Sequence, residues 1–521
     1  MSNLSRPIPI PEPSTYSEKY LTSLCRKTFL SLWSYSNLYR DQGQRNGIGF
    51  GKEICDLLVL FDNTIIIFSD KQCAFPDSGN LDRDWSRWFR RAVLESANQI
   101  WGAERWIRTF PKRIYLDKSC SIPFPLNIPD SVNLSVHRVV VAHEVSARIQ
   151  KEFGGSGTLI IDSTIRGSQH YLSSEQSPLH PFTIGNIDPH QGFIHVLDDS
   201  SLEIVLGTVD TIIDFISYLK KKETLLLGGM PISAAGEEEL LAYYLSRVNE
   251  DREHDFLYPS GSEGLLISEG LFQQFQNSPG RKSQLHEDKI SYYWDRLIET
   301  FAGHIAAGTD YFSSLTDIAL KEESIREIAR ETRLRRRILA RALLDLITKS
   351  SAHRRSVRVV PPSRNGEPYY LFLLMPIEKE WNLEKYRVLR RQLLFAYCMS
   401  VKIIYPDASK IIGIATESGL PDKVSNDVLL IDTTQWTEEN FQEAQSIQKE
   451  YKLLENMKKQ HNMDSEYPKS NSPSKAEPII RRLQSLSRNK VCYCGSGKKY
   501  KECHGILVKK RPLRKRHKSK S

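Results

Sequence analysis

Three cysteines and one histidine lie within thirteen residues near the end of the chain: Cys492, Cys494, Cys503 and His504. Their spacing, C-x-C-x8-C-H, predicts a tetrahedral zinc site with three thiolate ligands and one imidazole ligand. Four protein ligands leave no position for a substrate or a reactive water, so the predicted Zn2+ is structural rather than catalytic. Because so short a segment buries little apolar surface, metal binding would supply most of its folding free energy.

The residues around this cluster, Val491 to Leu507, resemble the SEC-C motif. This motif is the zinc-binding tail of the SecA preprotein translocase ATPase and also occurs at the ends of many unrelated proteins. The resemblance implies that the three cysteines and the histidine are the zinc ligands of a module at residues 489–507. It also implies a possible protein partner, since the tail of the translocase binds a chaperone.

A second set of residues that could do chemistry lies on a predicted β-hairpin. Two apolar runs, 54–61 and 64–71, flank an Asp-Asn turn, which is typical of a hairpin. Asp56 lies in the first run and Lys71 ends the second. Metal-assisted hydrolysis of a phosphodiester needs these residue types, because carboxylates hold Mg2+ and a lysine stabilises the developing negative charge.

This hairpin resembles the core of the PD-(D/E)XK nuclease superfamily and, within it, the nuclease-related and Mrr-like branches. The resemblance implies a restriction-endonuclease-like α/β domain in which Asp56 binds catalytic Mg2+ or Mn2+ and Lys71 assists hydrolysis. It implies that Glu53 lies beside the cation and that Gln99 is the polar residue of the following helix. In this superfamily a helix that precedes the strands often adds a glutamate.

The chain departs from the superfamily pattern at Ser69, which stands where a carboxylate is expected two residues before Lys71. Three interpretations remain open. A β-bulge could turn Asp70 toward the site. The carboxylate could instead come from the following helix, where Glu95 lies one turn before Gln99. The third interpretation is an inactive site on a fold that only binds.

We interpret the tryptophans of one predicted helix and three scattered histidines as structural residues. The helix predicted at 82–106 carries four tryptophans, and three of them lie in an apolar stripe that we interpret as a core-facing surface rather than a base-stacking platform. His180, His190 and His195 lack metal-ligand spacing, and we expect them to be surface or turn histidines.

Composition and charge limit the class of protein. No apolar run approaches the roughly 20 residues that a membrane helix needs. The start of the chain is polar and rich in proline, and the remaining cysteines form no disulfide framework, so we expect a cytoplasmic protein. The net charge is +9, and the basic tail at 508–521 alone holds eight lysines and arginines. The tail is therefore predicted to attract nucleic-acid phosphates or to act as a solubilising segment.

The 521 residues leave room for several domains. We predict an opening helix at 15–40 and, much later, a strand at 401–405. The predicted organisation is a nuclease-like α/β domain at 15–165, a helix-rich α+β region at 185–350, a smaller α/β domain at 355–462, a linker at 463–478, the zinc module and the tail.

Two functions from different classes follow. The first is a divalent-metal-dependent nuclease that carries a structural zinc module. The second is a non-catalytic adaptor, associated with a chaperone or the ribosome, in which the nuclease-like domain is degenerate.

Overall fold

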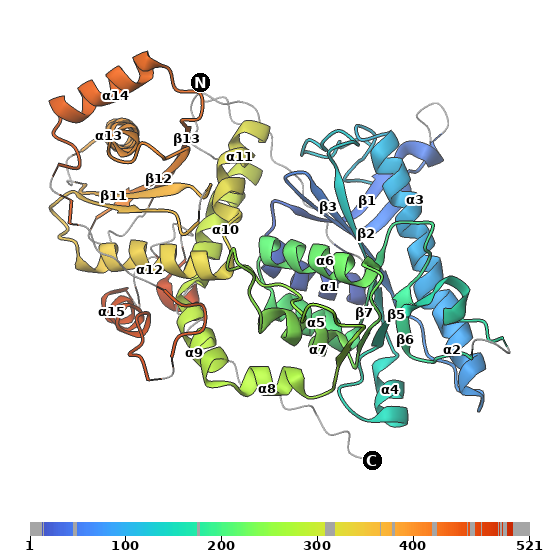
Figure 1. Cartoon of the computed structure of the whole chain (residues 1–521). Helices are drawn as coiled ribbons and strands as arrows, with labels where there is room; N and C mark the ends of the chain where they lie inside the picture. The colour runs from blue at the N-terminus through green and yellow to red at the C-terminus, as the bar shows by residue number, and fades with distance from the viewer. Residues whose placement is uncertain are drawn as a thin grey trace. The chain divides into compact units, whose positions relative to one another are not determined.

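The chain forms two compact units in the computed structural model (Figure 1). The N-terminal unit comprises residues 1–278 and 302–322, and the C-terminal unit comprises residues 279–301 and 323–521. Both units combine β-sheets with helices, so the fold is mixed α/β, as predicted. The structure describes residue 13 and residues 15–44, 49–174, 178–307, 318–364, 366–377, 381–418, 425–455, 457–458, 464–469, 471–487, 489, 492 and 498–503.

A five-stranded sheet with the order β1-β2-β3-β4-β7 forms the centre of the N-terminal unit. Strands β1, β2 and β3 are antiparallel, whereas β3, β4 and β7 are parallel. The strands are β1 (Ser34–Arg40), β2 (Lys52–Phe61), β3 (Thr64–Lys71), β4 (Ser135–Ala142) and β7 (Ile194–Asp198). The hairpin predicted around Asp62 is therefore confirmed as β2 and β3.

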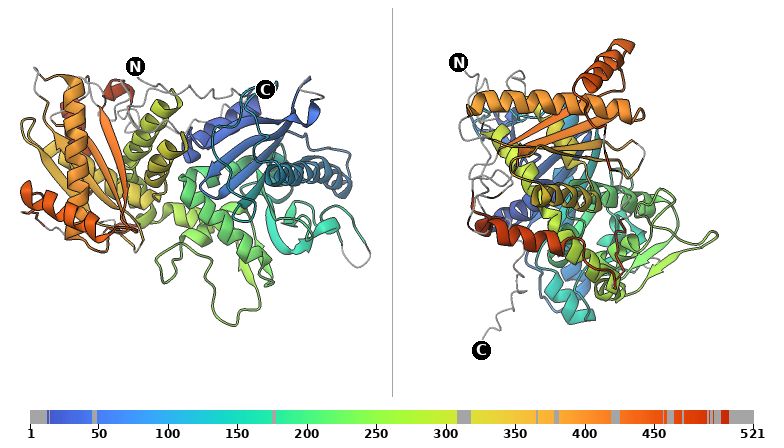
Figure 2. Two further views of the ribbon diagram at one scale, coloured as in Figure 1. Left: turned by 90° about the horizontal axis from the view of Figure 1, so that it is seen from above. Right: turned by 90° about the vertical axis from the view of Figure 1, so that its left-hand side faces the viewer.

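Helices cover both faces of this sheet. Helices α1 (Tyr16–Phe29), α5 (Asp199–Thr208) and α6 (Ile212–Leu227) lie on one side, and α2 (Leu81–Phe89) and α3 (Glu95–Thr109) lie on the other (Figure 1). Figure 2 shows the same sheet from above, with α3 along one side of the blue strands. We call these two sides the α1/α6 face and the α3 face.

A second sheet of the same unit has the order β6-β5-β8-β9. Its strands are β5 (Ile160–Arg166), β6 (Thr183–Asn186), β8 (Ile232–Ala234) and β9 (Leu265–Ile267). The remaining helices here are α4 (Ser146–Phe153), α7 (Glu237–Leu245) and α8 (Leu271–Asn277). Helix α7 contacts β8, β9 and α5, so it joins the smaller sheet to the helices of the α1/α6 face.

The C-terminal unit contains a four-stranded sheet with the order β10-β11-β12-β13, in which β11 and β12 are parallel. Helix α12 contacts β10 and β11, and α13 contacts β11, β12 and β13. Gly413 lets α13 approach β12 closely, because a Cβ at this position would lie 2.5 Å from Sγ of Cys398. The strands are β10 (Ser356–Val360), β11 (Tyr369–Met375), β12 (Lys410–Glu417) and β13 (Asn426–Asp432). The helices are α9 (Pro279–Glu287), α10 (Tyr292–Ala306), α11 (Ile318–Ala329), α12 (Arg333–Lys349), α13 (Leu383–Ile404), α14 (Glu438–Glu450) and α15 (Glu477–Ser487), although parts of α10 and α11 belong to the N-terminal unit.

The chain near the predicted linker at 463–478 makes specific contacts within the C-terminal unit. The guanidinium of Arg337 donates a 2.6 Å hydrogen bond to the backbone oxygen of Ser465. The carboxylate of Glu287 accepts a 3.1 Å hydrogen bond from the backbone N–H of Ala476. These contacts hold the segment against α9 and α12.

The opening helix is shorter than predicted, and the second half of the predicted range is a strand. Helix α1 begins after a capping box, in which Thr15 caps the helix and Glu18 bonds back to the Thr15 amide. It ends at Leu30, whose φ of 65° breaks the helical path. Serines and aromatic residues follow, and their low helix propensity and good fit to a pleated sheet explain why the chain continues as β1.

The strand predicted at 401–405 is wrong, because these residues continue or end α13. Leu394, Tyr397, Cys398 and Val401 recur at the i, i+3, i+4, i+7 spacing of one helix face. All four pack into the core against β11 and β12. The β-branched residues at 401–404 thus follow the helical burial pattern rather than their own propensity.

The tryptophan-rich helix is confirmed as a core element. The rings of Trp85 and Trp88 are fully buried, and their indole N–H groups donate to the backbone oxygens of His170 and Cys73. The stripe therefore stabilises the domain and is closed to nucleic-acid bases. Among the described residues, no helix combines the length and apolarity needed to cross a membrane.

Candidate active site

The side chains of β3 alternate between the two faces of the central sheet. The ring of Phe68 packs against Phe29 of α1 and Phe215 of α6. The next residue, Ser69, donates a 3.4 Å hydrogen bond to Oε1 of Gln99 on α3. Because successive residues of a strand point to opposite sides, Ser69 and Lys71 share the α3 face.

Lys71 and Glu95 meet on the α3 face. Nζ of Lys71 lies 3.9 Å from Oε2 of Glu95, and the two side chains are 37% and 59% exposed. A salt bridge this exposed contributes little to stability. The salt bridge instead fixes the place of Glu95 relative to β3. Glu95 and Gln99 lie one turn apart on α3, and both contact the end of β3. Both side chains are exposed to solvent.

A π-helical turn at Arg90–Leu94 immediately precedes Glu95 and joins α2 to α3. One extra residue in a helical turn rotates everything that follows relative to the residues before it. Such turns are rare, and they occur often at functional sites. Here the π-helical turn changes the direction in which Glu95 and Gln99 point from α3.

Asp56 lies on β2 beside Ser69 and is half-buried. Its Oδ2 accepts a 2.6 Å hydrogen bond from the backbone N–H of Asp70. Burial raises the pKa of Asp56 to about 6, and the charge of Asp70 adds to this, against the opposing hydrogen bonds from the Asp70 amide and the Ser69 hydroxyl. A carboxyl group in this environment favours a cation as its partner.

Two further acids act on Asp56. Glu53 lies on the same strand, and partial burial, followed by the charges of Asp56 and Glu18, raises the pKa of Glu53 to about 7. Glu18, on α1, also raises the pKa of Asp56. Sequence reasoning did not single out Glu18, although the capping-box spacing from Thr15 marks the start of α1.

Asp70 lies on the α1/α6 face, away from the group around Asp56. Its Oδ1 lies 2.5 Å from Nε2 of His143, whose Nδ1 lies 2.7 Å from Oδ1 of Asp199. The pairing of β3 with β2 and β4 is regular over the recorded register, so no bulge turns Asp70 round. The structure thus brings Glu53, Asp56, Lys71, Glu95 and Gln99 to one region and leaves the Asp70 side chain outside it.

The predicted zinc module is described in part. Cys492 and Cys503 are buried. The backbone N–H of Cys492 donates a 2.7 Å hydrogen bond to the backbone oxygen of Lys498. Cys494 and His504 lie outside the described residues. Two buried thiols at the ends of the motif fit the soft-ligand chemistry that Zn2+ takes in Cys3His sites.

The histidines that were expected to lie at the surface behave differently from one another. His180 and His190 are exposed, as predicted. His195 is not a surface or turn residue: it is the second residue of β7 and has no exposed area. The sequence signal available for this is its place in the apolar run Phe193–Leu197.

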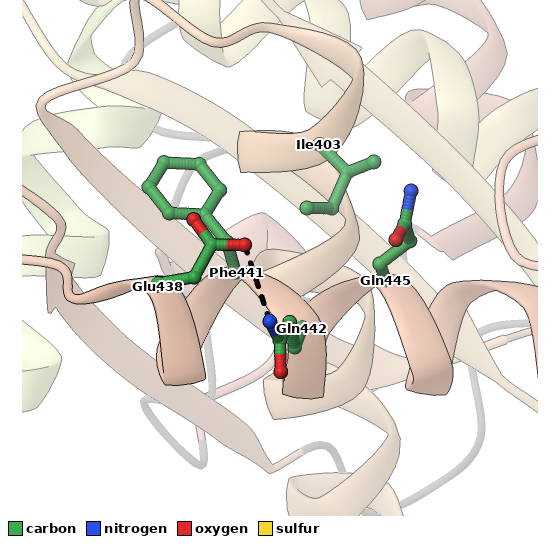
Figure 3. Close-up of a pocket in the computed structure, with 5 residues that line it drawn as sticks. All are labelled: Ile403, Glu438, Phe441, Gln442 and Gln445. Atoms are coloured by element: carbon green, nitrogen blue, oxygen red, sulfur yellow. Dashed lines mark hydrogen bonds between the residues drawn. The ribbon is translucent and has the colours of Figure 1, made fainter.

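A pocket of about 340 Å3 lies on the C-terminal unit between α13 and α14 (Figure 3). It is lined by Ile403, Glu438, Phe441, Gln442 and Gln445. Glu438 is its single titratable residue, and its carboxylate accepts a 3.3 Å hydrogen bond from Gln442. This lining has no nucleophile and no paired acid and base, so it supports no reaction.

Comparison with known proteins finds a SEC-C motif and partial similarity to SecA proteins. The SEC-C motif model matches residues 488–506. The chain is 37% identical to protein translocase subunit SecA 1 of Bordetella avium over 95 residues, 18% of this chain and 10% of that protein. It is 29% identical to SecA of Cupriavidus pinatubonensis over 236 residues, 40% of this chain and 25% of that protein.

A shorter match, to SecA 1 of Nitrosospira multiformis, is 54% identical over 35 residues, 7% of this chain and 4% of that protein. The chain thus spans a quarter or less of the length of these curated relatives. No solved structure matches the chain. These findings identify a SEC-C motif, which is a zinc-binding motif, near the C-terminus of this protein.

Proposed function

We propose that the N-terminal unit is a divalent-metal-dependent nuclease of the PD-(D/E)XK type. Asp56 and Glu53 would hold Mg2+ or Mn2+, and Glu95 would supply the carboxylate that Ser69 lacks. Glu18 is a further candidate ligand because its charge acts on both Glu53 and Asp56. Asp70 is left out of the ligand set, since its side chain pairs with His143.

The observation that supports this proposal most strongly is the grouping of Asp56 with Ser69 and Gln99 next to the Lys71–Glu95 ion pair. Asp56 and Glu53 come from β2, Lys71 from β3 and Glu95 from α3. Burial raises the pKa values of Asp56 and Glu53, and the charges of Asp70 on Asp56 and of Asp56 on Glu53 add to this, as expected for carboxyl groups that await a cation. A divalent cation prefers oxygen ligands, which this group provides.

The residues of the chain have separable roles in this proposal. A bound divalent cation would polarise the scissile phosphate and lower the pKa of a water molecule. Glu95 orients the Lys71 ammonium group, which stabilises negative charge as water attacks phosphorus and the bond to the leaving sugar oxygen breaks. Gln99 holds Ser69 and thereby the end of β3.

The C-terminal module would serve this function as a binding arm. Cys492, Cys494, Cys503 and His504 would hold a structural Zn2+, in keeping with the SEC-C match. The module would engage a protein partner, and the basic tail after it would engage nucleic-acid phosphates. Neither contact requires chemistry at the zinc ion, because its four ligands fill the coordination shell.

The direct test is cleavage by the purified full-length protein. Plasmid DNA and structured RNA are incubated with the protein, with and without Mg2+ or Mn2+. We expect cation-dependent cleavage that falls about 10²- to 10³-fold in Asp56→Asn and in Lys71→Met. Asp130→Asn and Lys112→Met change the same charges at exposed positions and should cleave like the wild type. No cleavage of any substrate, or equal cleavage by all variants, would refute the nuclease.

Binding without cleavage is the second candidate, and Ser69 is the observation that favours it. Without a carboxylate at this position the site has one cation ligand fewer than the superfamily pattern. A degenerate site predicts nucleic-acid or protein binding with no cation-dependent cleavage. It also predicts that Glu95→Gln leaves the binding of nucleic acid or protein unchanged. The nuclease proposal predicts instead that Glu95→Gln binds the divalent cation more weakly.

A further inference from the structure

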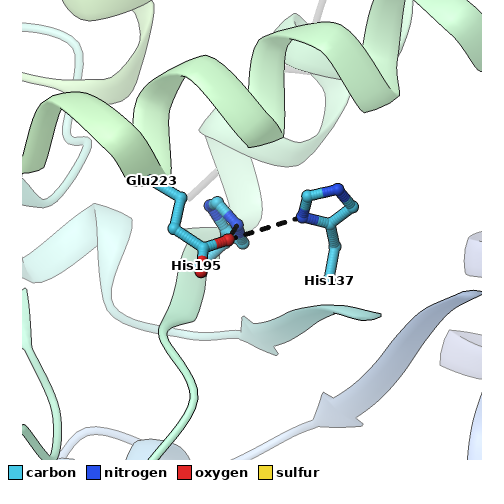
Figure 4. A group of neighbouring side chains, drawn as sticks. All are labelled: His137, His195 and Glu223. Atoms are coloured by element: carbon cyan, nitrogen blue, oxygen red, sulfur yellow. Dashed lines mark ion pairs between the residues drawn. The ribbon is translucent and has the colours of Figure 1, made fainter. Parts of the chain in front are cut away.

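Two buried histidines and one glutamate converge on the α1/α6 face of the central sheet. His137 lies on β4, His195 on β7 and Glu223 on α6 (Figure 4). His137 is 3% exposed and His195 is fully buried. Figure 4 shows Glu223 reaching down from its helix to the two rings. The three residues are 28 to 86 positions apart in the sequence, so the fold brings them together.

The ring nitrogens of both histidines lack hydrogen bonds. Neither Nδ1 nor Nε2 of His137 or of His195 has a hydrogen-bond partner among the described residues. Buried polar groups are nearly always satisfied, and leaving one unsatisfied costs free energy. Four unsatisfied nitrogens at one place require an explanation, and an ion bound by one nitrogen of each ring would account for two of them.

The spacing of the three residues suits a single metal ion. Nδ1 of His137 lies 3.5 Å from Oε2 of Glu223, and Nε2 of His195 lies 3.9 Å from the same oxygen. One ligand atom from each residue lies within 4.8 Å of the others. Tetrahedral ligands with bonds of about 2.1 Å are separated by about 3.4 Å. Small side-chain movements would therefore complete the coordination.

The charges around the group also suit a cation. His195 is fully buried, and burial disfavours the protonated ring, so a neutral ring nitrogen can donate a lone pair. The two nearby cations are already paired: Lys222 with Glu237, and Arg138 with Glu104 through two hydrogen bonds of 2.6 and 2.7 Å. Neither cation is left to neutralise Glu223.

We propose that His137, His195 and Glu223 bind one divalent transition-metal ion, with Zn2+ as the ion that best suits two imidazoles and a carboxylate. The ligand atoms would be Nδ1 of His137, Nε2 of His195 and Oε2 of Glu223. The Glu223 side chain is 27% exposed, which gives the ion a path from solvent and leaves a fourth position open to water. This site is separate from the SEC-C cluster and lies on the opposite face of the sheet from Asp56.

Full-length Cys503→Ser protein is the suitable background for the test, because it removes a ligand of the SEC-C cluster. Zinc content is measured by mass spectrometry after dialysis in excess Mg2+, and affinity is measured by competition with a chelator. We expect one zinc per chain in this background, unchanged by Asp56→Asn. Glu223→Gln should weaken zinc binding at least about tenfold, while Glu203→Gln, an exposed glutamate, should have no effect.

Cobalt substitution provides a second readout. Co2+ in the Cys503→Ser background should give visible d–d bands that disappear in His195→Gln and persist in His190→Gln. The conclusion does not depend on His195→Gln folding, since Glu223 is partly exposed and its variant preserves the side-chain shape. No zinc in the Cys503→Ser background, or equal affinity in Glu223→Gln and Glu203→Gln, would overturn the site and leave a metal-free histidine–carboxylate pair.

Discussion

The backbone N–H of Asp70 donates a 2.6 Å hydrogen bond to Oδ2 of Asp56. The side chain of Asp70 points to the other face of the sheet, where it pairs with His143 at 2.5 Å. One residue thus orients the candidate cation ligand through its backbone and anchors the end of β3 through its carboxylate. Asp70 therefore has a structural role, although it lies next to Lys71 in the sequence and close to the expected position of the metal ligand.

The His143 contact predicts a dependence of stability on alkaline pH. Burial lowers the pKa of His143, but the hydrogen bonds to Asp199 and Asp70 and their charges outweigh it and raise the pKa to about 10. A folded-state pKa above the unfolded value of about 6.5 means that the stabilisation is complete below pH ~6.5 and is lost as the pH rises toward 10. Unfolding free energy should fall by at most about 1.4 kcal/mol per pH unit.

Urea unfolding between pH 7 and pH 9.5 measures this dependence. This range lies above the pKa of Asp56, which is about 6. His143→Gln should be less stable at pH 7 and should show a flatter profile than the wild type. The exposed-site variant His190→Gln serves as the control. Parallel profiles for the wild type and His143→Gln would contradict the assignment.

Restoring the missing carboxylate should make stability depend on a cation. Ser69 is 3% exposed and lies beside Asp56, so Ser69→Asp places two carboxylates together in a buried position. Without a divalent ion we expect a loss of about 1–3 kcal/mol. Mn2+ at 100 times its Kd should recover about 2.7 kcal/mol.

Denaturant unfolding with and without Mn2+ tests this expectation, and Ser69→Asn controls for side-chain size. Cation affinity in Ser69→Asp should also become less sensitive to Glu95→Gln, because the new carboxylate replaces the one from α3. Equal destabilisation with and without Mn2+ would show that no cation binds beside Asp56.

Cation affinity at the candidate active site should rise with pH. The pKa values of Asp56, about 6, and Glu53, about 7, mean that protons compete with the cation in the acidic range. Titration calorimetry with Mn2+ should give tighter binding at pH 7.5 than at pH 5.5, and Asp56→Asn should reduce this difference. An affinity independent of pH would place cation binding elsewhere.

The stability of the C-terminal unit should depend on Arg390. Its guanidinium lies 2.8 Å from Glu417 and 2.7 Å from Asp427, and its side chain is fully buried. Arg390→Met would leave two acids without their buried counter-ion, and we expect a loss of about 3–5 kcal/mol. Hydrogen exchange of α13 and β12 should report this loss. Arg391→Met, at a 38% exposed neighbour, should have little effect.

The basic tail should contribute a salt-dependent part of any nucleic-acid binding. Its eight lysines and arginines have no acidic neighbour within residues 508–521. Deleting these residues should reduce the slope of log K against log salt by about 0.9 for each phosphate that the tail neutralises. A tail of equal length with glutamine at those eight positions controls for size. An unchanged slope would indicate a solubilising role.

Local patterns were sufficient for some elements and not for others. The β2–β3 hairpin and the tryptophan stripe were predictable, because turn residues and burial periodicity lie within one segment. The break at Leu30 and the helical course of Val401–Ile404 were not, because packing against distant strands decided them. At residues 401–404, propensity alone favoured the wrong element.

The sequence by itself determined the SEC-C cluster and the presence of Asp56 and Lys71 on paired strands, since both depend on residues a short distance apart in the chain. Only the tertiary structure decided which acids accompany Asp56, because strand alternation assigns a face only after α1 and α3 are placed against the sheet. Only the tertiary structure likewise showed which residues lie beside His195. Its partner His137 lies 58 residues earlier, and Glu223 lies on a helix that packs over both. Contacts of this kind leave no spacing pattern in the chain.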